Sequence, residues 1–143
     1  METLNAIYNK DFYAWTVEVT KLLRQRKFDK VDIHRVADII ETAGKNEKEE
    51  ALGHLSLLMA YLLKELIKFK NDSMTHIKNL RKELLNLLAG SPSLKLRLQE
   101  KFGEAYEKAV MIVAEELGIV DHDFPKYCPF SLEDCLDEKF FPT

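Results

Sequence analysis

The feature that most constrains the fold is a leucine-rich segment with helical spacing in the middle of the chain. Its apolar positions recur every three or four residues, at Leu52, Leu55, Leu58, Met59, Leu62, Leu66 and Phe69. This spacing is that of an amphipathic helix, and the pair Asn46 and Glu49 resembles a capping box at its start. Because Leu57, Leu63 and Ile67 widen the apolar stripe, we expect a central helix from Asn46 to Phe69 with neighbours on several sides.

Similar apolar stripes elsewhere predict a bundle of about five main helices. Besides the central helix, the expected ranges are 11–27, 32–44, 71–90 and 91–118. Asp11, Asp32 and Ser91 are suitable N-caps, whereas Gly44, Gly90 and Gly118 suit the left-handed position that ends helices. The alternation over 94–98 would also suit a strand, but the spacing from Phe102 to Leu117 remains helical, so we expect one helix there, with Pro92 in its first turn.

From Asp121 onward the chain becomes rich in aromatic residues and proline. One short helical turn is expected after Ser131, and the tail should pack across the bundle through its phenylalanines, Phe124, Phe130, Phe140 and Phe141. No repeat or linker divides the chain. The sequence therefore predicts an all-α, single-domain helical bundle over residues 1–143, with an aromatic and proline-rich C-terminal tail packed on it.

Composition excludes several classes of protein. With 46% hydrophobic and 31% charged residues in 143, the chain is too apolar for a disordered protein and long enough for one core. A formal net charge of −3 gives no global attraction to nucleic acid or to an anionic membrane, although nucleic acid stays a possible partner. The nearly uncharged run 55–63 is too short to cross a bilayer, and no secretory signal starts the chain, so we expect a cytoplasmic protein that does not bind membranes. Abundant lysine and glutamate with only two glutamines is compatible with a thermophilic source.

Cys128 and Cys135 are the only cysteines, and their spacing is not that of a Cys-x-x-Cys pair. Three interpretations remain: two buried thiols, a disulfide, or a zinc site completed by His122. We prefer the two buried thiols. Two other groups have simple interpretations. Trp15 is expected in the core, and the basic residues near the middle of the chain are expected on a solvated face: Lys64, Lys68, Lys70, Lys78, Arg81 and Lys82.

Five segments occur in the same order in a known family. They are DFYAWT at 11–16, Asp38-x-x-Glu41-x-x-Gly44-Lys45-x-Glu47, HLSLLMAYLLK, SPSL at 91–94 and FPKYCPFSLEDCLD. Together they resemble the bacterial and archaeal family catalogued as domain of unknown function 29. The resemblance implies a helical fold and no established activity. The family often has histidine where Tyr61 stands and tryptophan where Glu65 stands, so roles at those positions do not carry over.

A cluster of ionisable residues flanks the turn expected at Gly44. If the two helices fold back there, positions equally far from Gly44 approach one another, including His34 opposite His54. The candidate metal or polar cluster comprises Asp38, Glu41, Lys45, Glu47, Glu50 and His54. Carboxylates and imidazoles are ligands for divalent metals, and Lys45 could stabilise developing negative charge. The spacing differs from the Glu-x-x-His of di-metal bundles, so we prefer to interpret these residues as ordinary charges flanking helix ends.

The function predicted from these patterns is a non-enzymatic protein-interaction module that binds another protein or self-associates, for example as a homodimer. No phosphate-binding glycine loop, nucleophile elbow or Cys/His pair is present, and enzymatic activity stays an open question. The first alternative is a metal-dependent nuclease or hydrolase that uses the cluster around Gly44; a divalent metal would then be its only cofactor. The second alternative is a nucleic-acid-binding accessory protein.

Overall fold

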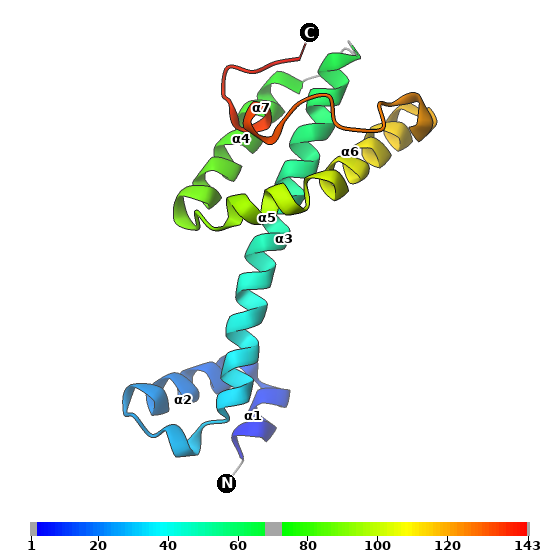
Figure 1. Ribbon diagram of the computed structural model, residues 1–143. Helices are drawn as coiled ribbons and strands as arrows, with labels where there is room; N and C mark the ends of the chain where they lie inside the picture. Colours follow the sequence, from blue (N-terminus) through cyan, green and yellow to red (C-terminus); the bar gives the residue numbers. More distant parts are fainter. Residues whose placement is uncertain (1–2, 68–72, 143) are drawn as a thin grey trace. The chain divides into compact units, whose positions relative to one another are not determined.

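The computed structural model describes residues 3–67 and 73–142 (Figure 1). Its elements are α1 Leu4–Lys10, α2 Phe12–Arg24, the 3₁₀ helix η1 Phe28–Lys30, α3 Ile33–Leu66, α4 Ser73–Gly90, α5 Leu94–Glu100, α6 Phe102–Leu117, η2 Asp121–Asp123 and α7 Leu132–Leu136. No strand occurs in these ranges, which confirms the all-α fold. Phe69, where the central helix was expected to end, and the expected cap at Asn71 and Asp72 lie outside the described residues.

The chain divides into two compact units, Met1–Gly44 and Lys45–Thr143, here called the N-terminal unit and the C-terminal unit. Each has its own apolar cluster. That residues 1–143 form a single domain stays a prediction.

The N-terminal unit is built on α1, α2, η1 and the first turns of α3. Asp11 caps α2 as predicted, because its side chain accepts a hydrogen bond of 3.0 Å from the backbone N–H of Ala14. Among residues 3–44, three are buried: Trp15 and Val19 from α2, and Val31 just before α3. The prediction that Trp15 is a core residue is confirmed.

Helix α3 differs from the prediction at Gly44. The expected stop there and the new start at Asn46 are wrong, because α3 continues from Ile33 to Leu66. Gly44 is helical, and Gly118 is the only glycine in the described part of the chain with a positive φ. A glycine ends a helix when it adopts the left-handed conformation; inside a helix it costs only about 1 kcal/mol relative to alanine. The good helix formers Ala43, Lys45 and Glu47 surround it and favour continuation.

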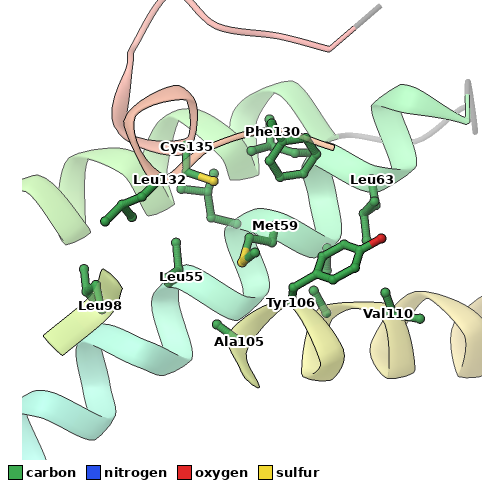
Figure 2. Packing of buried hydrophobic residues seen from close by; sticks show 14 of the residues in the cluster. Leu55, Met59, Leu63, Leu98, Ala105, Tyr106, Val110, Phe130, Leu132 and Cys135 are labelled. Atoms are coloured by element: carbon green, nitrogen blue, oxygen red, sulfur yellow. The ribbon is translucent and has the colours of Figure 1, made fainter. Parts of the chain in front are cut away.

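The C-terminal unit packs α4 to α7 around the second part of α3. Fully buried side chains form a stripe along α3, at Leu55, Leu58, Met59, Leu62 and Leu63, and the burial of Ser56, Ala60 and Lys64 extends it to a neighbouring face. Figure 2 shows side chains of α5, α6 and the tail gathered around them: Leu98, Ala105, Tyr106, Val110, Phe130, Leu132 and Cys135. The expectation of a central leucine-rich helix with neighbours on more than one side is therefore confirmed.

The helix expected over 91–118 is two helices in the structure. α5 ends at Glu100 and α6 begins at Phe102, with Lys101 between them at φ −104° and ψ 11°. The first helical residue is Leu94, so the predicted N-cap at Ser91 is also wrong; Ser91 instead accepts a turn hydrogen bond from the N–H of Leu94. The stop at Gly118 is confirmed by its φ of 67°.

The C-terminal tail packs onto this unit as predicted. Phe124 and Phe130 are buried, and Phe140 and Phe141 pack against the same cluster. The turn expected after Ser131 is α7, whose capping box joins Ser131 and Asp134.

Of the six basic residues expected on a solvated face, Lys68 and Lys70 lie outside the described residues and Lys78 and Lys82 are exposed, but Arg81 and Lys64 are buried. Arg81 is 1% exposed, and its guanidinium donates to the backbone oxygens of Cys135 at 2.8 Å and Asp134 at 3.2 Å. These carbonyls belong to the last turn of α7, where a cation satisfies otherwise unpaired acceptors. Burial lowers the pKa of Arg81. Lys64 is also buried and pairs with Glu116 at 2.5 Å. Nε and Nη2 of Arg81 and Nζ of Lys64 thus bind neighbouring helices, not solvent.

Candidate functional site

A surface pocket of about 430 Å³ lies between α3 and α4 in the C-terminal unit. Glu50 and His54 line it from α3, one helical turn apart, and Glu83, Asn86 and Leu87 line it from α4. It is the place where the structure gathers members of the predicted polar cluster.

His54 connects the two walls of this pocket. Its Nδ1 lies 2.8 Å from the backbone oxygen of Glu50, and its Nε2 lies 2.7 Å from Oε2 of Glu83. Both partners are acceptors, so both hydrogen bonds form together when each ring nitrogen carries a proton. In that form the pair is an imidazolium and a carboxylate, which joins α3 to α4 through a charge-assisted hydrogen bond.

Glu47 makes a second link, about two turns before His54 on α3. Its Oε1 accepts a hydrogen bond of 2.7 Å from the hydroxyl of Ser91, in the turn that follows α4. The Glu47 carboxylate therefore binds the side chain of a residue in this turn. Its role in the structure is to hold the end of α4 against α3.

The other predicted cluster members lie elsewhere on α3. Asp38 and Glu41 are exposed residues of the N-terminal unit, whereas Lys45 is an exposed residue of the C-terminal unit. Because α3 does not turn at Gly44, the chain reversal that was to bring all six together is absent. Within residues 3–67 and 73–142, no group of three or more His, Cys, Asp or Glu side chains is arranged to hold a metal ion. Metal binding by these residues stays a prediction.

Glu83 is the member of the pocket that the sequence analysis missed. It directly precedes the buried Leu84 and stands at the edge of the apolar stripe of α4. Glu50 and His54 stand at the edge of the apolar stripe of α3 in the same way. Pairing them requires knowing that α4 packs beside this part of α3, which no local pattern reveals.

A second hollow lies between α6 and the tail. Its volume is about 530 Å³, and it is lined by Tyr106, Glu107, Val110, Met111, Asp121, His122, Phe124, Pro125 and Lys126. The hydroxyl of Tyr106 donates a 2.7 Å hydrogen bond to the carbonyl of Pro125 and so fixes the tail beside α6. A smaller hollow of about 380 Å³ next to it reaches Cys128.

The two cysteines are free thiols in this structure. Cys135 is buried and Cys128 partly buried, so the preferred interpretation of two buried thiols holds fully only for Cys135. Burial raises the pKa of Cys128 to about 11 and raises the pKa of Cys135 further. Since the thiolate is the nucleophile and the metal ligand, this environment disfavours both roles.

Membrane insertion through a helix finds no support in the described residues, where no helix is both long enough and apolar enough to cross a bilayer. No curated protein and no solved structure matches the chain. One family profile does match, with the description "Domain of unknown function DUF29", over residues 7–141. Because this match covers nearly the whole chain, including all five ordered segments of the resemblance, the chain belongs to the DUF29 family.

Proposed function

We propose that the protein is a non-enzymatic interaction module that associates through its N-terminal unit, in the first instance with a second copy of itself. The observation that carries this proposal is the exposure of large apolar side chains in this small unit. At least half of the surface of each is exposed in Phe12, Tyr13, Val17, Phe28, Ile33 and Ile40. Such surfaces in soluble proteins commonly mark places where another protein binds.

The most regular part of this surface lies on α3. Ile33, Ala37, Ile40 and Gly44 are all exposed, and Ile40 is 68% exposed. Their spacing of four, three and four residues is that of a coiled-coil seam, and the small residues permit close approach of a second helix. We call these four residues the α3 stripe. On the same helix, Val36 and Ile39 pack against the core of the unit, so α3 is apolar on two faces here.

The size of the N-terminal unit gives a reason for association. Three buried residues form its core, and a unit of about 40 residues buries a small share of its surface, so that additional contacts are usually needed for stability. Pairing of the α3 stripe would remove Ile33 and Ile40 from water. Each fully buried isoleucine contributes roughly 1.5–3 kcal/mol.

The test is light scattering after size-exclusion chromatography, over protein concentrations from about 1 μM to about 1 mM, which covers moderate to weak association. The wild-type chain should show a concentration-dependent dimer, and Ile40→Gln should shift the equilibrium toward monomer by at least about tenfold. Leu96→Gln is the matched control, because Leu96 is similarly exposed but lies on α5. A wild-type chain that stays monomeric throughout, or a dimer weakened equally by the control, would overturn self-association.

A metal-dependent hydrolase is the second candidate, favoured by one observation. Glu50 and His54, both members of the predicted cluster, line one pocket together with Glu83. Calorimetric titration with Mn²⁺, paired with a nuclease assay, tests it on wild-type protein and His54→Ala. Binding heat and hydrolysis that both disappear in the variant would support the hydrolase; no heat and no hydrolysis in the wild type would exclude it.

A further inference from the structure

The strongest local concentration of positive charge lies at the end of α2. Five of the ten residues from Lys21 to Lys30 are basic and one is acidic, which gives +4 in a chain whose net charge is −3. We call the basic residues the basic turn: Lys21, Arg24, Arg26, Lys27 and Lys30. All five are exposed, and within the described residues none of them forms an ion pair.

The helix dipole accounts for only part of this charge. Lys21 and Arg24 lie in the last turn of α2, where cations favourably face the unpaired carbonyls. Arg26, Lys27 and Lys30 follow the helix and gain nothing comparable from it. A purely structural explanation therefore leaves three of the five cations without a role.

The backbone holds these residues in a defined turn. The N–H of Lys27 donates to the carbonyl of Leu22 at 2.9 Å, and the N–H of Arg26 donates to the carbonyl of Leu23 at 3.0 Å. This is a Schellman motif, and Arg26 occupies its left-handed position with φ 59°. Glycine is the residue that usually stands there. An arginine at this position adds a positive charge although its backbone conformation is less favourable than that of glycine.

One aromatic ring accompanies the cations. Phe28, in η1, is 52% exposed and follows Lys27 directly. The other apolar residues of the segment, Leu22 and Leu23, pack against the core of the N-terminal unit. An exposed ring among unpaired cations is the combination that binds single-stranded nucleic acid, in which phosphates meet the charges and a base stacks on the ring.

We propose that the basic turn binds single-stranded nucleic acid, with its cations on the phosphates and Phe28 on a base. A membrane surface fits less well, because interfacial binding needs a broad apolar face and this segment exposes one apolar side chain beside Asp29. A duplex groove fits less well too, since the cations after α2 lie on a turn and not along a helix that could enter the groove. The proposed surface differs from the α3 stripe and extends the interaction function to a second class of partner.

Fluorescence anisotropy with a labelled oligo(dT) of about 12 nucleotides, a length within the usual site size, tests the proposal on the full chain. With about four phosphate contacts, affinity should fall about 50-fold between about 50 and 200 mM salt. The triple variant Arg26→Gln/Lys27→Gln/Lys30→Gln should reduce the slope of log affinity against log salt by about 2. The matched control, Lys82→Gln/Lys95→Gln/Lys108→Gln, changes the net charge equally at exposed positions of the C-terminal unit and should leave the slope unchanged.

Phe28→Ala tests the stacking contact separately. It should weaken binding of oligo(dT) about fivefold or more without changing the salt slope, and it should not affect binding of an abasic strand of equal length. Circular dichroism establishes that each variant retains its helix content before binding is compared.

Three outcomes of the oligonucleotide measurements would overturn the proposal. The first is the absence of oligonucleotide binding at about 50 mM salt, where phosphate contacts are strongest. The second is a control triple variant whose salt slope falls as much as that of the Arg26/Lys27/Lys30 variant. The third is a Phe28→Ala chain that binds oligo(dT) and the abasic strand as tightly as the wild type does. The last measurement is binding of the protein to vesicles that contain phosphatidylserine. Binding to vesicles without binding to oligo(dT) would identify the basic turn as a membrane contact and would likewise overturn it.

Discussion

The two units differ in the size of their buried apolar cores. In the C-terminal unit, side chains from α3 to α7 and the tail form one continuous cluster in which Leu55, Leu58 and Leu62 are inaccessible to solvent. Among its described residues, the N-terminal unit buries three and leaves Tyr13 and Ile40 largely exposed. The difference indicates a division of labour in which the C-terminal unit supplies stability and the N-terminal unit supplies surface.

The largest expected effect comes from truncating the C-terminal core. Leu58→Ala should lower the free energy of unfolding by about 2–5 kcal/mol, because it removes buried methyl groups and leaves a cavity. Trp15 is the chain's one tryptophan and lies in the N-terminal unit, so its fluorescence reports that unit, whereas circular dichroism reports all helices. In urea titrations, Leu58→Ala should shift the dichroism transition much more than the fluorescence transition.

Val19→Ala is the counterpart in the N-terminal unit and should mainly shift the fluorescence of Trp15. If each variant moves both transitions together, the two units unfold cooperatively. That result would show that the two units do not differ in stability and would favour a single domain over residues 1–143.

The next effect concerns the tail of the C-terminal unit. Arg81→Met keeps much of the buried volume but removes the donors to the carbonyls of Asp134 and Cys135. Leaving buried acceptors unpaired costs about 1–3 kcal/mol. Hydrogen exchange should then rise most in α7, and the transition of Trp15 should stay in place. Equal protection of α7 in the variant and the wild type would show that the phenylalanines alone hold the tail.

A smaller effect is expected from the half-buried thiol. Burial raises the pKa of Cys128 from 9.0 to about 11, so the folded chain holds the thiol proton over a range in which the unfolded chain releases it. Stability should therefore fall as pH rises from about 9 to about 11. The fall should be shallower in Cys128→Ala. Urea midpoints of the two proteins across this range check the prediction, and identical slopes would contradict it.

Local signals in the sequence predicted much of the fold. The cap at Asp11, the helical turn after Ser131 and the stop at Gly118 depend on residues within one turn, and the structure has all three. The buried faces of α3 and α6 followed from apolar spacing. Where a helix ended without its usual residue, as α2 does with Arg26 in the left-handed position, no sequence pattern marked the motif.

The candidate site could be predicted only in part, because it depends on contacts between distant segments. Glu50 and His54 were candidates, but Glu83, which bonds to His54, is 29 residues beyond it. The burial of Arg81 likewise depends on the tail, 53 and 54 residues later. Edge positions of amphipathic helices look alike in a sequence until the neighbouring helix is known.

The smallest expected effect tests the point where prediction and structure differ most, at Gly44. In a continuous α3, Gly44→Ala should raise stability by about 0.5–1 kcal/mol, since alanine is the better helix former and its Cβ would meet no atom within 4 Å. In a left-handed turn the same change would be destabilising, because an added Cβ is strained at positive φ. Gly118→Ala provides that contrast within the same protein, since Gly118 has φ 67°; it should cost about 1–2 kcal/mol. In urea titrations, a gain in the free energy of unfolding for Gly44→Ala and a loss for Gly118→Ala would establish that α3 runs through Gly44. A loss for both variants would indicate a left-handed turn at Gly44.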